Sequence, residues 1–573
     1  MTVRFKDQGQ SKLGKWLCVG AALGGCLLLA ATAAPSLAQV APAASQVTPK
    51  TLAPEQPHAN AAINLTPSPG AAPPGAANLH FVPAKIVLSG GLDRMARISD
   101  GLIAPLQGHY VTVKQLYQLA AAIEGAYAKA GYPFARVTVP PQALKDNGVV
   151  TLIVVDGYIE TIDLSHLPSR LRIPVGQLLQ PLVNRAWLRY SDVERRVTLA
   201  GQVSGANLRT ALARGDHPGG VKLIVEGDYT PVQGDVSYDN RLGPAFKNRE
   251  ANLQLSLNSP LGLGEQVYAF ASGDPSQIDR MFTSQALRKA VGGGISLPFG
   301  ANGTKLNLET TTSVTQPLGG FFLTRDDFVR DAFRLSTPLI VHRDRSLTGT
   351  VSVELVRETE AAPQFGVDLS IDRYTLVRGE LDYWTMLGAD TLTASTQLTH
   401  AWGAQPETAP LSRGDAQTHF GKLTLNADYK HPLPYGFRSD ITFQGQAVLS
   451  GGLPTSELLA LDGPAGLSTF TSGQLPAEQG ASLRLSVSRP LTIVPDRLQV
   501  SPYVFVAGGK ASFALKTAFD TTAAEAAGVG VEIDAQPPHM AMPLSLTIEY
   551  GDQDSNGPIV DRHRVTFALN SPF

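Results

Sequence analysis

The feature that most constrains this chain is an alternation of apolar and polar side chains from about residue 232 to the C-terminus. Segments 253–257, 423–429, 441–447 and 544–550 each place apolar residues mainly at every second position. Successive side chains of a β-strand point to opposite faces, so each segment predicts a strand with one apolar and one polar face. Such strands suit a barrel between lipid and a wet lumen, and they also suit a soluble sandwich.

Three further features favour the membrane barrel: an N-terminal export signal, loops of very uneven length, and a chain that ends on an aromatic residue in mid-strand. Along the last strand, Phe567, Leu569 and Phe573 share one face, and we take them as a C-terminal barrel signal. At about 21 residues per strand with its connection, residues 230–573 predict about 16 antiparallel strands, an even number. That number gives a pore-sized barrel.

The N-terminus predicts a cleaved secretory signal over residues 1–38. Lys12 and Lys15 precede an apolar stretch, and small residues end it at Ala38. Cys18 and Cys26, the only cysteines, lie inside this signal, so the mature chain would hold no disulfide and no cysteine-based metal site. Residues 39–78 contain 11 Ala and 8 Pro with almost no large apolar side chains, which predicts a semi-extended linker.

Between linker and barrel, a pattern of strand, helix, helix, strand, strand occurs twice, over residues 79–158 and 159–229. In the first unit Thr112 should cap a helix that ends near Gly131. In the second, we expect a helix over 175–183, and Ser191 with Glu194 should form the capping box of another. Each unit leaves an open sheet edge, where an extended polypeptide could add itself as a strand.

Residues 131–142, with the sequence GYPFARVTVPPQ, resemble the first polypeptide-transport-associated (POTRA) domain of two-partner secretion transporters, the haemolysin secretion/activation family. Segments 238–240, 257–265 and 337–341, together with Phe573, are also similar to that family. The resemblance implies two periplasmic α+β POTRA domains before a 16-stranded outer-membrane barrel. It also implies that client polypeptides bind the POTRA strands, represented here by Phe134, Val137, Val139, Leu208, Thr210 and Leu212.

In that family a surface loop folds back into the barrel, and its arginine meets an aspartate of a barrel strand. Here the matching loop segment holds Gly463, Pro464, Leu467, Ser468, Thr469 and Phe470, and the matching strand holds Phe505, Ala507 and Gly509. Ser468 and Ala507 stand where the two charges would be. Replacing both partners of an enclosed ion pair can be neutral, whereas losing one costs about 3–5 kcal/mol, so the paired absence supports the alignment. We expect packing and hydrogen bonds around Leu467, Thr469 and Phe470 to hold this loop.

Three motifs are interpreted as coincidences. Val377-Arg378-Gly379 spells part of the loop motif but lies on an alternating strand too early in the barrel. Asp552 to Gly557 opens like a calcium loop, but His563 stands at the position of the bidentate glutamate. Leu23 to Cys26 only loosely resembles a lipoprotein box. In relatives an N-terminal helix can plug the barrel, but residues 39–78 have no convincing helical pattern to support one here.

The sequence contains no catalytic or nucleotide-binding motif, and we expect neither an enzyme nor a cofactor nor a metal site. A near-neutral balance of 47 basic and 49 acidic residues argues against nucleic acid as a partner. The predicted function is export of a large, unfolded exoprotein, with outer-membrane lipid and the barrel-assembly machinery as further partners. Two alternatives stay open: a barrel-assembly factor of the same superfamily, and a passive porin.

Overall fold

The structure, a computed structural model, describes residues 42–52 and 72–573, except 218, 278, 281–282, 284, 405–407, 514–520, 538–541 and 557–561. The predicted signal peptide, with both cysteines, lies outside the described residues. No helix among the described residues is long and apolar enough to cross a membrane.

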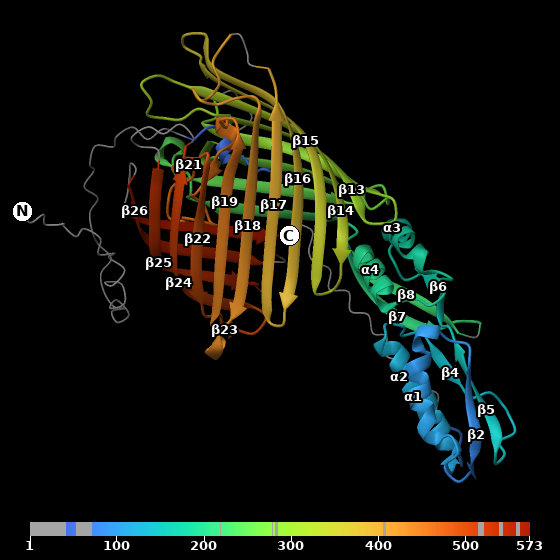
Figure 1. Cartoon of the computed structure of the whole chain (residues 1–573). Helices are drawn as coiled ribbons and strands as arrows, with labels where there is room; N and C mark the ends of the chain where they lie inside the picture. Colours follow the sequence, from blue (N-terminus) through green and yellow to red (C-terminus); the bar gives the residue numbers. More distant parts are fainter. Residues whose placement is uncertain are drawn as a thin grey trace, which may run out of the picture. The chain divides into compact units, whose positions relative to one another are not determined.

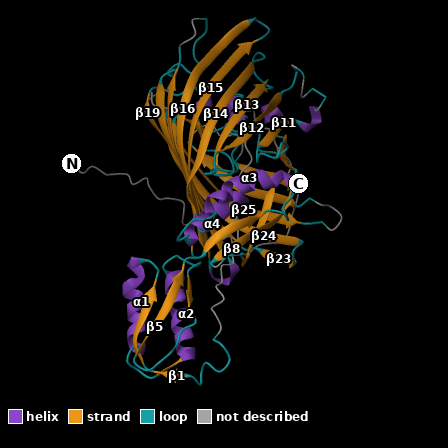
Figure 2. Ribbon diagram, turned by 90° about the vertical axis from the view of Figure 1, so that its right-hand side faces the viewer, coloured by secondary structure: helices purple, strands orange, loops and turns teal. Residues whose placement is uncertain are grey.

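Two α/β units with one topology precede the barrel (Figure 1). The first contains β2 (Pro83–Ser89), α1 (Ala96–Ile103), α2 (Val113–Lys129), β4 (Arg136–Thr138) and β5 (Gly148–Val155), beside a two-stranded sheet of β1 (His80–Phe81) and β3 (Val111–Thr112). The second contains β6 (Tyr158–Asp163), α3 (Ser169–Leu179), α4 (Tyr190–Gly201), β7 (Ala206–Arg214) and β8 (Gly220–Tyr229). The sheet orders β2-β5-β4 and β6-β8-β7 correspond strand for strand, which confirms the predicted repeat. Figure 2 shows the helices of the first unit beside its sheet.

Helix α2 begins and ends where the sequence predicts. The Thr112 hydroxyl accepts a hydrogen bond from the backbone N–H of Gln115, and the Gln115 side chain accepts one from Thr112 in return. Gly131, with φ of 92°, follows the last turn in the left-handed conformation that favours glycine. One helix face, which includes Leu116 and Ile123, is buried against the sheet.

The predicted capping box of the second unit is wrong. Helix α4 begins at Tyr190, one residue before Ser191, and no side chain in the described part of the chain caps its N-terminus. Glu194 instead lies 3.1 Å from the ring of His342 in a barrel turn. Helix α3 also differs from the expected 175–183, because it begins at Ser169 and its continuation, η5 (Gln180–Leu182), is a 3₁₀ turn.

The described strands of the C-terminal part form a closed antiparallel barrel, as predicted. They are β9 (Val232–Asp239), β10 (Glu250–Asn258), β11 (Gln266–Gly273), β12 (Arg288–Phe299), β13 (Thr304–Thr315), β14 (Arg325–Val341), β15 (Arg345–Ala362), β16 (Val367–Leu387), β17 (Asp390–Trp402), β18 (Phe420–Pro432), β19 (Arg438–Ser450), β22 (Gln479–Ser488), β23 (Leu491–Val494), β24 (Leu498–Ser512), β25 (Thr521–Ala535), β26 (Leu544–Ser555) and β27 (His563–Pro572). Strands β22 and β23 both pair with β24 and form one interrupted strand, so 16 strands close the barrel in the described part of the chain.

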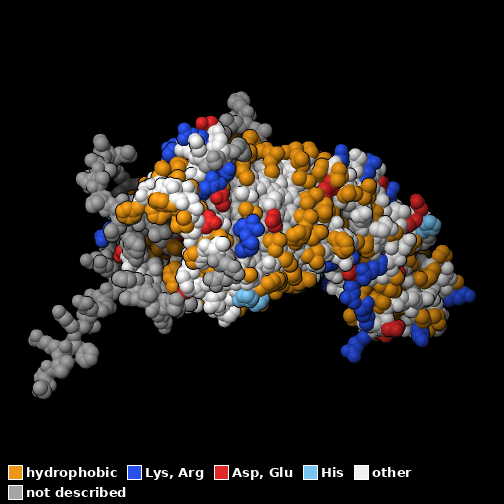
Figure 3. Space-filling view, turned by 90° about the horizontal axis from the view of Figure 1, so that it is seen from above, with side chains coloured by type: hydrophobic (Ala, Val, Ile, Leu, Met, Phe, Trp, Pro, Cys, Tyr) orange, Lys and Arg blue, Asp and Glu red, His pale blue; other side chains and the backbone are white. Residues whose placement is uncertain are grey.

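Alternation gives the barrel its two faces. Along β14, Phe333 and Leu335 are about half exposed on the outer face, whereas Arg330 and Ala332 are buried on the inner one. Figure 3 shows hydrophobic side chains gathered over the outer face of the strands. Polar side chains turned inward and apolar ones turned outward are the arrangement that a bilayer requires of a barrel.

The C-terminal residue joins the two ends of the barrel. Gly234 of β9 and Phe573 exchange backbone hydrogen bonds of 2.8 and 2.9 Å. The ring of Phe573 occupies the space that a side chain at Gly234 would need. Two further residues of the predicted C-terminal signal lie at the same seam: Leu569 is opposite Tyr238, and the Phe567 ring is 5.5 Å from that of Tyr238.

Candidate functional site: the barrel lumen and its loop

The connection between β19 and β22, residues 451–478, contacts inward-facing side chains of the barrel wall. It contains η9 (Thr455–Glu457) and a small hairpin of β20 (Leu459–Ala460) and β21 (Pro476–Ala477). Its apolar side chains form a buried cluster with residues of β24 and β25, among them Phe505 and Ala526. We call residues 451–478 the lumen loop.

Glu457 anchors the base of the lumen loop to two strands. Its carboxylate lies 2.8 Å from Arg378 of β16 and 2.8 Å from Lys422 of β18, and all three side chains are nearly fully buried. Arg378 also lies 3.2 Å from Glu354 of β15. Arg378 does lie on an early barrel strand, as predicted, yet it contacts the loop. The sequence did contain a signal for this contact, because Arg378 is a charged residue on the lumen face of its strand, but the prediction did not use it.

The far end of the lumen loop has its own polar anchors. Glu478 lies 3.0 Å from Arg413, and its carboxylate accepts a hydrogen bond from the backbone N–H of Leu453. Within the loop, the buried carboxylate of Asp462 accepts backbone hydrogen bonds from Gly473 and Leu475. These contacts fix the loop's conformation by satisfying buried backbone donors.

The loop tip meets the strand that the sequence analysis paired with it. Leu467 and Phe470 are buried in one cluster with Phe505 and Ala507 of β24. Gly509 of the same strand leaves room for the loop, since a Cβ there would lie within 3.4 Å of Leu461. Among the other predicted loop residues, Gly463 turns the chain with φ of 105°, Pro464 is exposed, and the carbonyl of Thr469 accepts a hydrogen bond from Arg564.

Two residues that the sequence analysis did not identify contact Ser468. Its hydroxyl donates a hydrogen bond to Glu549 of β26 and accepts one from Arg484 of β22. Arg484 and Glu549 are themselves joined at 2.6 Å, and both are buried. An ion pair therefore lies at the loop tip, but both of its charges belong to the barrel wall.

Residues 42–52 also lie against lumen-facing side chains. They form no α-helix in the described part of the chain, as expected, but their position in the lumen was not predicted. The backbone N–H groups of Ala44 and Leu52 donate to Asp326 and Glu309, at 2.7 and 2.9 Å. Arg330 donates to the carbonyl of Pro49 at 2.8 Å. Apart from one 3₁₀ turn, η2 (Ser45–Val47), the segment is irregular. Barrel side chains bind this segment through its backbone, so the identity of its own side chains did not predict its position in the lumen.

The sheet edges proposed for client binding differ between the two α/β units. In the first, β4 has three residues, and the edge N–H of Val137 already donates to the carboxylate of Glu124 at 2.8 Å. Burial raises the pKa of Glu124, while the hydrogen bond from Val137 opposes that rise. Phe134 is buried in the core of the second unit, and Val139 follows the end of β4.

In the second unit, β7 has nine residues at the edge of its sheet and carries Leu208, Thr210 and Leu212. The Leu208 and Leu212 side chains pack against the core of this unit. The Thr210 hydroxyl is buried and has no hydrogen-bond partner among the described residues. The longer strand presents more of its backbone at the edge than β4 does.

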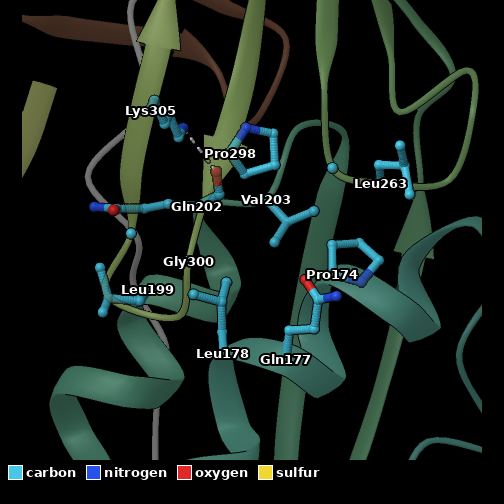
Figure 4. A pocket seen from close by; sticks show the side chains of 12 residues that line it. Pro174, Gln177, Leu178, Leu199, Gln202, Val203, Leu263, Pro298, Gly300 and Lys305 are labelled. Carbon is cyan, nitrogen blue, oxygen red and sulfur yellow. Dashed lines mark hydrogen bonds between the residues drawn. The ribbon is translucent and has the colours of Figure 1, made fainter. Parts of the chain in front are cut away.

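The second α/β unit contacts the barrel turns through charged side chains. Arg195 of α4 donates to the carbonyls of Pro338 and Leu339, at 2.9 and 3.3 Å. Lys305 donates to the carbonyl of Gln202 beside a cavity of about 30 Å³ lined by α3, α4 and two turns (Figure 4). That volume admits water but no substrate. No group of three or more His, Cys, Asp or Glu placed to hold a metal occurs in the described residues.

The first barrel turn, within the segment that resembled the family, is fixed by Glu265. Its buried carboxylate accepts hydrogen bonds from the backbone N–H groups of Leu261 and Leu263. Asn258 next to the turn donates to the carbonyl of Thr230, at the end of the second α/β unit. This part of the sequence therefore couples a tight turn to the domain junction.

The fold and lumen define a class: an outer-membrane β-barrel protein with periplasmic POTRA domains. Residues 221–534 match the family described as haemolysin secretion/activation protein ShlB/FhaC/HecB, and residues 81–157 match the POTRA domain of ShlB type. The chain belongs to this family, whose members are non-enzymatic transporters of two-partner secretion.

The relatives agree with this assignment. The chain is 27% identical over 244 residues to the outer membrane transporter CdiB of Escherichia coli, covering 42% of this chain and 40% of that relative. It is 22% identical over 430 residues to the heme/hemopexin transporter protein HuxB of Haemophilus influenzae, covering 71% of each. The solved structure of CdiB from Escherichia coli superposes with a TM-score of 0.66 at 20% identity, covering 89% of this chain and 94% of that one, which shows the fold.

Proposed function

We propose that this chain exports one large exoprotein across the outer membrane. Members of its family transport secreted exoprotein partners. The client would arrive unfolded in the periplasm, add a strand to the POTRA sheets, and leave through the barrel. Folding of the client outside would prevent its return and supply the driving force. The sequence contains no nucleotide-binding motif that could supply another.

The observation that carries the proposal is that two segments of the chain itself lie in the lumen against its inner wall. The lumen loop and residues 42–52 are held there by ion pairs and hydrogen bonds to inward-facing side chains, not by covalent links. A conduit for a polypeptide needs a wide pore that is blocked until a client arrives, because an open one would leak solutes. A passive porin has no use for such a blockage.

Client capture is assigned to the edges of β4 and β7, with β7 as the main site. Strand addition takes its affinity from backbone hydrogen bonds and its specificity from pockets for alternate side chains. On β4 the carboxylate of Glu124 already occupies the donor of Val137, so a client strand must displace it. Strand β7 is longer and lies at the opposite sheet edge from β6.

Photo-crosslinking tests this capture directly. A photoreactive residue at Arg209 in β7, an exposed position, should trap one large secreted polypeptide in growing cells. The matched control is the same residue at Arg97, exposed on α1 of the first unit. Trapping of many unfolded barrel proteins would identify an assembly factor instead. Trapping of nothing, together with steadily open channels in planar bilayers, would identify a porin.

A further inference from the structure

Beside the loop tip, the wall supplies a complete ion pair to a neutral loop residue. Arg484 lies opposite Ala507 in the strand register, next to the position where the family aspartate would stand. Its guanidinium is 2.6 Å from Glu549 and 4.0 Å above the ring of Phe505. Ser468 hydrogen-bonds to both members of the pair.

The wall around this pair is shaped by glycines. In the register, Gly530 of β25 lies between Tyr503 and Glu549, and a Cβ on it would overlap the Tyr503 ring. Because Gly530 has no Cβ, the Tyr503 hydroxyl can reach across β25 and donate to Glu549 at 3.0 Å. Gly551 likewise leaves the space that the Thr469 methyl group of the loop tip occupies. The pair and the seat of the loop tip therefore form one constructed site.

We propose that Arg484 and Glu549 are positioning residues that hold the tip of the lumen loop through Ser468 and let the tip leave them without separating a charge pair, while Glu457 keeps the base of the loop bound to Arg378 and Lys422. When a loop arginine leaves a wall aspartate, a buried charge loses its partner, which is the costly case for an enclosed pair. At this pair the departing tip loses only the two hydrogen bonds of the Ser468 hydroxyl, while Arg484 and Glu549 stay paired with each other. The loop tip is thus held in a defined place by hydrogen bonds that break without the free-energy cost of an unpaired buried charge.

The inference rests on the proposed function for its purpose, because easy release of the loop tip matters for a conduit that must open for a client. Its geometry does not depend on that function. The loop tip contains Phe470, which is 1% exposed, and no Lys or Arg occurs in residues 451–478. Chymotrypsin, which cleaves after aromatic residues, can therefore report release of the loop at Phe470.

The experiment measures the rate of chymotrypsin cleavage after Phe470 in the purified full chain, with products mapped by mass spectrometry. Ser468→Ala should raise this rate about tenfold, the effect of losing a hydrogen bond to a charged group. Ser472→Ala, in the same loop, is the matched control and should leave the rate unchanged. Glu549→Gln should raise the rate at least as much as Ser468→Ala, whereas Glu532→Gln, an exposed carboxylate in β25, should not.

A double exchange separates positioning from mere stability. The variant Ser468→Arg with Arg484→Ser moves the cation from the wall to the loop, so that release would leave Glu549 unpaired. Cleavage should then fall about tenfold below the parent chain, although the barrel contains the same charges. Unchanged cleavage in both Ser468→Ala and the double exchange would overturn the inference. Cleavage does not measure export, so a negative cleavage result would not contradict the proposed function. A negative crosslinking result would likewise not contradict the role of Arg484 and Glu549 at the loop tip.

Discussion

Glu457 of the lumen loop and Arg378 of β16 form a two-point ion pair inside the barrel. One nitrogen of the guanidinium lies 2.8 Å from one carboxylate oxygen, and another lies 3.2 Å from the second. Lys422 adds a further cation at 2.8 Å. Paired contacts of this kind fix direction as well as distance, so the base of the loop has a defined position against β16 and β18.

Arg378→Gln should destabilise the barrel by about 3–5 kcal/mol, because it removes a partner from a buried carboxylate. The measurement is the denaturant midpoint at which the purified chain loses its compact form. Arg373→Gln is the matched control, since Arg373 is exposed on the same strand. Equal midpoints for the two variants would show that Glu457 does not depend on Arg378.

Glu124→Gln should stabilise the first POTRA domain at pH 8. Burial raises the pKa of Glu124, so the folded domain binds this proton more tightly than the unfolded chain does. Stability from the protonated form is complete at low pH and is lost as pH rises through the raised pKa. Glutamine keeps an acceptor for the N–H of Val137 and never ionises.

Hydrogen exchange of residues 113–138 in the full chain measures this effect, after correction for the intrinsic pH dependence of exchange. The gain in protection at pH 8 should shrink as pH falls below the pKa of Glu124. Glu226→Gln, an exposed carboxylate in β8, serves as control. If Glu124→Gln is less protected than the parent at pH 8, the hydrogen bond to Val137 needs the charge, and the assignment is wrong.

Trp187→Ala should loosen the joint between the two POTRA domains. The indole packs on Tyr127 and Tyr132 at ring distances of 6.0 and 6.3 Å. Each aromatic pair contributes about 0.5–1.5 kcal/mol beyond its buried area. Hydrogen exchange at residues 127–132 and 184–190 should speed up in this variant. Trp402→Ala, at an exposed barrel position, should not change exchange there, and equal exchange in both variants would refute the role of Trp187.

Arg195→Ala should loosen the contact between the second POTRA domain and the barrel, because it removes both hydrogen bonds to the carbonyls of Pro338 and Leu339. Faster hydrogen exchange in α4 and in the turn at 342–344 would report this. Arg97→Ala, exposed on α1, is the control. An α4 that exchanges at the parent rate in Arg195→Ala would mean that the other contacts, among them that of Glu194 with His342, hold the junction without Arg195.

The alternation predicted the barrel well because each strand must repeat the same two-faced pattern, and many short repeats average out local errors. The capping box at Ser191 failed because Glu194 finds a tertiary partner, His342, that no local pattern contains. The position of residues 42–52 in the lumen could also not be predicted from the sequence. Charged side chains of β13 and β14 bind that segment through its backbone, which every sequence has.

The loop tip illustrates the same limit within the site. The family pattern led to Ser468 and Ala507, and the structure places Ser468 in the loop tip and Ala507 on β24 in the cluster beside it. Arg484 and Glu549 are 65 residues apart, and only the register of four neighbouring strands brings them together. A sequence shows that a charge is missing from a motif, but it does not show which wall residues replace it.

The most direct test of the central claim compares the culture medium and the outer membrane of the parent strain with those of a strain that lacks this gene, by quantitative mass spectrometry. Export of one exoprotein predicts that a single large protein disappears from the medium of the deletion strain, while the barrel proteins of the outer membrane keep their abundance. Restoring the gene should return that protein to the medium. An unchanged medium, or a general depletion of outer-membrane barrels, would contradict the account.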